Sequence, residues 1–301
     1  MTILAVSSQV LVQNVIDGIA LGCLYALLAI GLALIFGVLG LLNWAYGELI
    51  MVGGYVLVIL SSIFLPLLIP LMVLVVVLVA LVMERVAFRP VRRASAETML
   101  ITSFGVSFLL QSLALLIFGQ NGRSANVASG LLRPVDVLGV SVARLDIVIV
   151  GVGGVLLGGL AVMLWRTTLG IQLRAAAQDF EVAQMLGVRA NRVIAVAFAL
   201  SGISAGAAAL LLTIQTGVVT PTFGLTPVVI AFVAVILGGM GSLTGGALGG
   251  LIVGALSVAF QALLPESLRP YREAFLYTVV FIMLTVRPQG LILASHRIDR
   301  V

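Results

Sequence analysis

The longest stretch without charge is the feature that most limits how this chain can fold. Between Val193 and Pro265 lie 73 consecutive residues with no charged side chain, whereas the segment Arg166–Arg192 just before it carries six charges. A soluble domain cannot bury so long an uncharged run, but a bilayer requires such runs and places charge in the connections. The sequence therefore predicts a protein that crosses the membrane several times and has one conspicuous polar loop.

The composition supports this interpretation. Hydrophobic residues make up 62% of the chain and charged residues 9%, against about 25% charged residues in soluble globular proteins. A membrane-spanning helix needs about 20 residues, so the 73-residue run can hold three spans. The other uncharged runs are Gly18–Gly47, Leu49–Met83, Thr98–Gly122 and Ile147–Trp165.

We expect an all-α integral membrane protein, a bundle of eight or nine transmembrane helices that forms a single domain over residues 1–301. Nine is the preferred count, and the short segments that contain glycine are expected to be broken or re-entrant. The predicted spans are Gln13–Leu39, Gly47–Ser62, Leu65–Met83, Thr98–Phe118, Asp146–Trp165, Arg192–Thr213, Pro227–Gly239, Gly245–Leu264 and Glu273–Val286.

The distribution of arginine predicts the orientation. All sixteen basic residues are Arg, and with nine spans and an external N-terminus eleven of them lie in the cytoplasm and five outside. The C-terminus is then cytoplasmic. Because the basic residues are scattered through loops, the net charge of +5 needs no nucleic-acid partner. The eleven are Arg85, Arg89, Arg92, Arg93, Arg166, Arg174, Arg189, Arg192, Arg287, Arg297 and Arg300.

The polar loop, residues 166–192, contains a short helix with both ends marked. Asp179 can accept hydrogen bonds from the first turn, Glu181 places negative charge near the positive end of the helix dipole, and Gly187 suits the left-handed position that ends a helix. Asn191 can cap the membrane helix that follows. A helix of about seven residues does not persist alone in water. Its apolar side chains therefore need a surface to cover: Phe180, Val182, Met185 and Leu186.

Two interpretations of this helix stay open on the residues alone. It could lie as an ordinary solvated helix on the protein's own base, or it could insert into a groove on a partner. Its place between two spans favours the second interpretation, because a firmly capped helix there can pass force into the bundle.

Seven blocks, distributed over nearly the full length, are Gly18–Ala26 (GIALGCLYA), Gly40–Glu48 (GLLNWAYGE), Glu84–Pro90 (ERVAFRP), Ser103–Gln111 (SFGVSFLLQ), Arg174–Ala183 (RAAAQDFEVA), Leu237–Ser242 (LGGMGS) and Arg287–Gly290 (RPQG). In this order they resemble the permease subunits of the high-affinity branched-chain amino acid ABC importers, the LivH type. Tyr46, where the family usually has His, and Thr244, where Pro is common, depart from the family pattern.

This resemblance implies a permease of the bacterial inner membrane that works with a second homologous permease subunit, two ABC ATPase subunits and an external binding protein. The implied cargo is leucine, isoleucine or valine, with urea, short amides or other amino acids as alternatives. The loop that carries Arg174, Ala183 and Gly187 is similar to the EAA-type coupling segment, which docks on the ATPase.

The residues argue against catalysis by this chain. A phosphate-binding loop needs a Lys, and the chain has none, so ATP is expected to be hydrolysed on separate chains and no cofactor or metal is expected here. One His, His296, and one Cys, Cys23, cannot form a catalytic triad or a zinc site. A secondary transporter driven by an ion gradient is the rival class. It would need carboxylates within the membrane, where Asp17 and Glu48 are the candidates.

A second group of residues is a candidate for the translocation path. Asn43, Tyr46 and Glu48 lie between the first two apolar segments, where a carboxylate is costly unless it is paired or hydrated. They either line the path or form a loop at the cytoplasmic surface. Gln111, in the fourth span, is polar but neutral, and such residues bridge helices more often than they bind substrate.

Glycines at four-residue spacing predict close helix packing, since they let membrane helices approach each other. The two predicted ladders are Gly241, Gly245 and Gly249, and beside them Gly246, Gly250 and Gly254.

Overall fold

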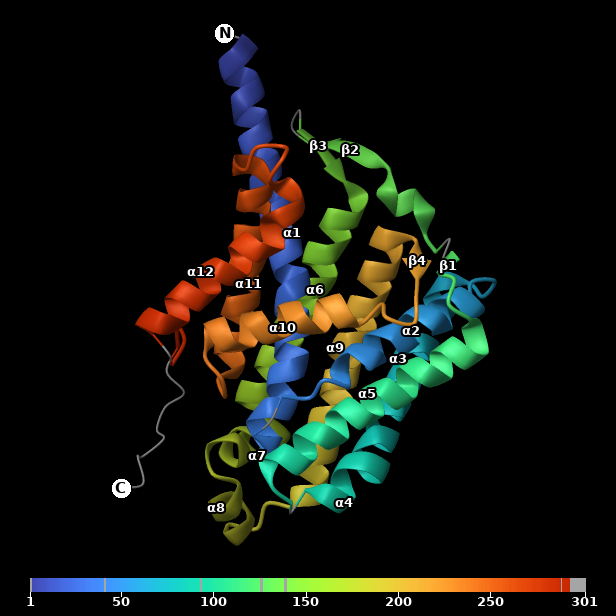
Figure 1. The fold of residues 1–301 in the computed structure, drawn as a ribbon, viewed down its shortest axis with the longest axis vertical. Helices are drawn as coiled ribbons and strands as arrows, with labels where there is room; N and C mark the ends of the chain where they lie inside the picture. Colours follow the sequence, from blue (N-terminus) through green and yellow to red (C-terminus); the bar gives the residue numbers. More distant parts are fainter. Residues whose placement is uncertain are drawn as a thin grey trace.

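The computed structural model describes residues 2–40, 42–92, 94–124, 127–137, 140–287 and 289–292. Arg93, His296, Arg297 and Arg300 lie outside the described residues. Within these ranges, each of the nine predicted spans is helical (Figure 1). The helices are α1 (Thr2–Leu39), α2 (Tyr46–Ile59), α3 (Leu65–Met83), α5 (Ala96–Phe118), α6 (Arg144–Arg166), α9 (Ala190–Thr216), α10 (Leu225–Gly238), α11 (Leu243–Leu263) and α12 (Arg272–Val286).

Six helices in the described part of the chain are long and apolar enough to cross a membrane, which confirms the all-α membrane class. The other three, α2, α10 and α12, have 14, 14 and 15 residues. At about 1.5 Å per residue they are shorter than the bilayer core of about 30 Å. In Figure 1, α10 runs across the long axis of the molecule rather than along it. These three are the segments that fit the expected broken or re-entrant class.

Helices α1 and α9 form the centre of the bundle. Helix α1 packs against α6, α9, α10 and α11, and α9 packs against α2 and α3. Small residues allow the closest of these approaches. A Cβ atom added at Gly250 would overlap the backbone of Ala26, and one added at Gly254 would overlap the backbone of Gly22. One predicted glycine ladder therefore lies against α1, as expected for close packing in lipid.

The other predicted ladder lies against α10, but it is shorter than predicted. Cβ atoms added at Gly245 and Gly249 would overlap the carbonyl groups of Gly238 and Ala234. Gly241 does not belong to the ladder, because it precedes α11 in a turn with φ +92°. Only the left-handed conformation closes that turn, after which the Ser242 hydroxyl caps α11 at the amide of Gly245.

The connections gather at the two ends of the bundle. At one end, β2 (Pro134–Val137) and β3 (Val140–Ala143) form an antiparallel hairpin, and β1 (Arg123–Ser124) pairs antiparallel with β4 (Val218–Val219). Short turns of 3-10 helix, η2 (Ser129–Leu132) and η3 (Arg269–Tyr271), also occur. At the opposite end lie α4 (Arg89–Val91), α7 (Thr168–Gln178) and α8 (Phe180–Met185), as Figure 1 shows. The π-helical turn η1 (Glu84–Phe88) joins α3 to α4.

Candidate functional site

The polar loop folds into two short helices that are held at their ends. The Thr167 hydroxyl accepts a hydrogen bond from the Gly170 amide (3.1 Å) and caps α7. The Arg174 guanidinium stacks over the Trp165 ring, with its central carbon 4.3 Å from the ring centroid. This cation–π contact, which the sequence did not predict, anchors α7 to the end of α6.

Both predicted ends of α8 are confirmed. A carboxylate oxygen of Asp179 accepts a hydrogen bond from the Val182 amide (3.0 Å). Gly187 has φ +90°, and the Val188 amide donates to the Ala183 carbonyl (3.0 Å). That pair of features is the Schellman arrangement, which satisfies carbonyls at a helix C-terminus.

Helix α8 rests on the protein's own base and still leaves much of its apolar surface uncovered. Ala183 is buried and Phe180 is half-buried against the core. Val182, Met185 and Leu186 are 49%, 84% and 80% exposed. The interpretation that the helix lies on the protein's own base holds for its buried face, and insertion into a partner stays a prediction for its exposed face. The exposed face is apolar and lies beside the membrane helices, and none of the described residues covers it.

The predicted path residues of the first two segments lie inside the bundle. Asn43 and Tyr46 are fully buried, and Glu48 is 1% exposed. These three side chains therefore do not form an exposed surface loop. The Tyr46 hydroxyl occupies the space where Gly31 of α1 has no side chain, next to Ser204 of α9.

Glu48 is held by two side chains of α5. One carboxylate oxygen accepts hydrogen bonds from the Ser107 hydroxyl (2.8 Å) and the Gln111 amide (2.7 Å). The other oxygen has no hydrogen-bond partner among the residues that the structure describes. Sequence reasoning missed Ser107. Its spacing of four residues from Gln111 places both on one face of α5 and was the available signal.

Gln111 also borders a pocket of about 380 Å³ between α5 and the turn that precedes α10. Ser112, Thr220 and Thr222 are among its other polar lining residues. The expectation that Gln111 bridges helices is confirmed, and the structure adds that it reaches a cavity. In the described part of the chain, no cluster of three or more His, Cys, Asp or Glu side chains could hold a metal ion.

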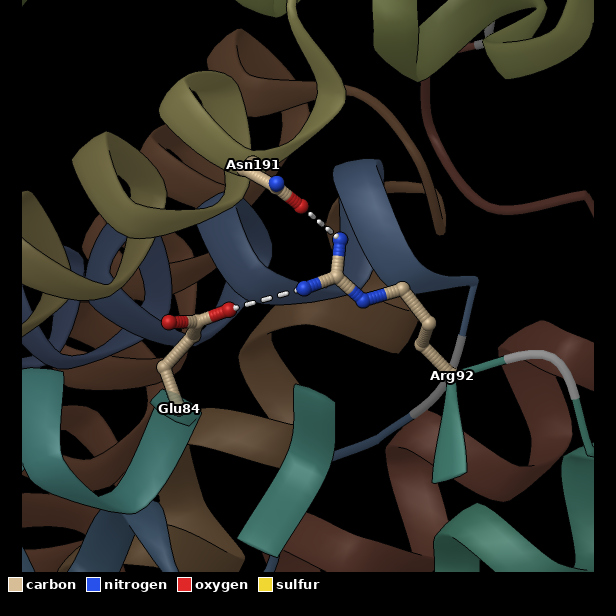
Figure 2. Close-up of polar contacts among 3 residues, drawn as sticks. All are labelled: Glu84, Arg92 and Asn191. Carbon is tan, nitrogen blue, oxygen red and sulfur yellow. Dashed lines mark hydrogen bonds and ion pairs between the residues drawn. The ribbon is translucent and has the colours of Figure 1, made fainter. Parts of the chain in front are cut away.

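Asn191 does not cap α9, contrary to the sequence prediction. The N-cap residue is Arg189, which makes no capping hydrogen bond through its side chain. The Asn191 side-chain oxygen instead accepts a hydrogen bond from Arg92 (2.7 Å), as Figure 2 shows. A charged donor from a distant segment competes successfully with the local backbone amides, because hydrogen bonds to charged groups are the stronger ones.

The long apolar helices of the bundle define a multi-pass membrane protein. Comparisons with known proteins identify the family. The sequence profile of the family described as "Branched-chain amino acid transport system / permease component" matches residues 14–284. No solved structure matches the chain.

Curated relatives of similar length agree with this profile. The chain is 30% identical to the high-affinity branched-chain amino acid transport system permease protein BraD of Pseudomonas aeruginosa, over 96% of this chain and 97% of BraD. It is 31% identical to the corresponding protein LivH of Escherichia coli K12, over 96% and 97% of the two chains. A probable LivH of Methanocaldococcus jannaschii is 30% identical over 77% of this chain and 75% of its own length.

The chain belongs to the family of permease components of branched-chain amino acid transport systems. Its relatives are transport permeases and not enzymes. With six helices of spanning length among its described residues, it is a multi-pass protein of the bacterial inner membrane.

Proposed function

We propose that this chain is the transmembrane permease subunit of an ATP-driven importer for the branched-chain amino acids leucine, isoleucine and valine. The observation that carries the proposal is the uncovered apolar face of α8, formed by Val182, Met185 and Leu186. Such a face, on a firmly capped helix between two membrane helices, fits a groove on a separate ATPase. The branched-chain cargo follows from the names of the relatives.

The proposed assembly contains a second homologous permease, two ATP-binding cassette ATPases and an external binding protein. ATP is bound by the ATPases, and this chain holds no cofactor. Residues 1–301 form one permease domain with nine membrane segments, an external N-terminus and a cytoplasmic C-terminus. The placement of α4, α7 and α8 at one end supports this orientation, because the loops after α3 and α6 are the arginine-rich ones (Figure 1).

Closure of the ATPases would displace the polar loop and switch the bundle between outward and inward access. The substrate path is proposed to follow the pocket that Gln111 borders. Gln111 donates a hydrogen bond to Glu48, and the buried Asn43 and Tyr46 lie in the turn that leads into α2. A buried carboxylate without a cationic partner is costly, which is why such residues in membranes are functional candidates.

Disulfide cross-linking to the ATPase tests the docking proposal. The single Cys23 is first replaced, and Glu181→Cys or Met185→Cys is combined with cysteines along the candidate groove of the ATPase. We expect a cross-linked product from at least one position in each series. Leu263→Cys, exposed on α11, is the negative control. Absence of any α8 product from a complex that copurifies intact would refute docking through α8.

Glu48 also keeps the rival class, a secondary transporter, open to test, since proton-coupled carriers use intramembrane carboxylates. Uptake into vesicles is measured with a protonophore while internal ATP is maintained. We expect uptake to continue. Its loss under these conditions would favour the gradient-driven mechanism. Competition by urea, short amides or other amino acids in the same assay separates the alternative cargoes.

A further inference from the structure

The block Glu84–Pro90 resembles the family pattern, yet it has no part in the transport role proposed above. In the structure its first five residues form the π-helical turn η1 at the end of α3. Pro90 follows one residue later, and its ring and missing amide hydrogen disfavour an ordinary α-turn before it. Single π-turns inside helices are rare and often mark functional positions.

The widened turn places Glu84 opposite Arg92, whose guanidinium contacts two partners at once (Figure 2). One guanidinium nitrogen lies 3.3 Å from a Glu84 carboxylate oxygen, and the other donates to the Asn191 side-chain oxygen at 2.7 Å. The side chains of Arg92 and Glu84 are 17% and 7% exposed. We call these three residues the clasp. Its members come from η1, from the end of α4 and from the first turn of α9.

The clasp closes one end of a longer contact between α3 and α9. Phe88 packs on Phe198, with ring centroids 5.5 Å apart. Further along α9, a Cβ atom at Gly202 would lie 3.1 Å from the Val77 backbone, so the two helices touch there without intervening side chains. The two helices are thus in close contact further along, and the clasp extends this contact to the first turn of α9.

The clasp also lies next to the segment that carries α8. Only the short connection Leu186–Arg189 separates the end of α8 from α9. A displacement of α8 is therefore passed directly to the first turn of α9 through this connection. There Asn191 meets Arg92.

We propose that Glu84, Arg92 and Asn191 are positioning residues that lock the first turn of α9 to the end of α3, so that movement of α8 drives both helices together. Arginine suits this role because its rigid, planar guanidinium holds donors on two separate nitrogens, one for each acceptor, whereas all the donors of Lys sit on one nitrogen at the end of a flexible chain. The proposal rests on the proposed function, in which α8 receives the movement of the ATPase.

The test compares Asn191→Leu with Asn191→Asp in the complete transporter, reconstituted with its ATPases and binding protein. Leu keeps the branched shape of Asn but removes the acceptor, whereas Asp keeps an acceptor for Arg92. We expect Asn191→Leu to lower the uptake per ATP hydrolysed by about tenfold, the factor that corresponds to loss of one hydrogen bond to a charged group. Asn191→Asp should stay near the wild-type ratio. Arg85→Ala removes an exposed charge from the same turn and serves as a further control.

A purely stabilising contact would lower the amount of folded protein without changing the uptake per ATP. An unchanged ratio for Asn191→Leu, or equal losses for Leu and Asp, would overturn the proposal.

Amide hydrogen exchange of the chain in lipid nanodiscs decides the same point without transport. Asn191→Leu should speed exchange in residues 84–92 as well as in 190–197, because the clasp joins them. Faster exchange confined to residues 190–197, or no change in either segment, would show that the clasp does not couple the two segments. If the wild-type complex shows no ATP-driven uptake, the proposed function fails, and the exchange measurement still decides the clasp.

Discussion

Helix α11 touches the central helix α1 backbone to backbone, whereas α8 in the polar loop leaves most of its apolar side chains uncovered. In lipid, apolar surface gives no drive for helices to associate, so the centre depends on small residues and dispersion contacts. At the water-exposed end of the bundle, apolar surface is costly unless something covers it. This contrast separates the glycines that pack the bundle from the exposed apolar side chains of α8, which we propose bind the ATPase.

The strongest test of this contrast is Gly250→Leu. The new side chain would overlap the backbone of Ala26 and separate α11 from α1. We expect destabilisation of about 3 kcal/mol or more, the upper range for overpacking, seen as loss of monodisperse protein in detergent. Gly158→Leu on α6 is the matched control, since a Cβ atom there meets nothing within 4 Å. Equal behaviour of the two variants would remove the assigned packing role of the ladder.

The double substitution Met185→Asp and Leu186→Asp tests the other region. Both side chains are exposed, so the melting temperature of the isolated permease should not change. Binding of the ATPase should weaken about 30-fold for each anchor worth about 2 kcal/mol, measured by titration in nanodiscs. Gln184→Ala on the same helix should bind normally. A lower melting temperature with unchanged ATPase binding would assign this face to the core.

Glu48 belongs to neither group of residues, because its side chain is polar and yet is buried in the bundle. Glu48→Ala should cost about 2 kcal/mol, since the Ser107 hydroxyl and the Gln111 amide lose a buried acceptor. Glu48→Gln keeps an acceptor oxygen and should retain most of the stability. Thermal unfolding in detergent measures both variants. Identical stability of the Ala variant and the wild type would contradict the role of this contact.

The smallest effect is expected for Asp179→Ala. Loss of the cap removes about 1 kcal/mol from α8, which should speed amide exchange in residues 180–185 and leave the melting temperature of the bundle unchanged. Asp179→Asn keeps a capping oxygen and should exchange as the wild type does. Slower or unchanged exchange in the Ala variant would show that packing of Ala183 and Phe180, and not the cap, holds the helix.

The positions of the helices and both ends of α8 could be predicted from sequence because their causes are local. Uncharged runs select the bilayer, and Asp179 and Gly187 act on amides and carbonyls within a few residues. Gly241 was assigned wrongly by the same local reasoning. Its spacing fits a helical ladder, but the chain turns before α11 begins.

The sequence by itself determined the membrane class, the succession of helices and the presence of a capped helix in the polar loop, since hydrophobicity and capping act over short distances along the chain. The tertiary structure alone decided which polar groups meet. Arg92 and Asn191 are 99 residues apart, and Glu48 and Gln111 are 63 apart. Whether such side chains come together depends on how each helix is rotated and how closely its neighbours approach, and the packing of the whole bundle sets both.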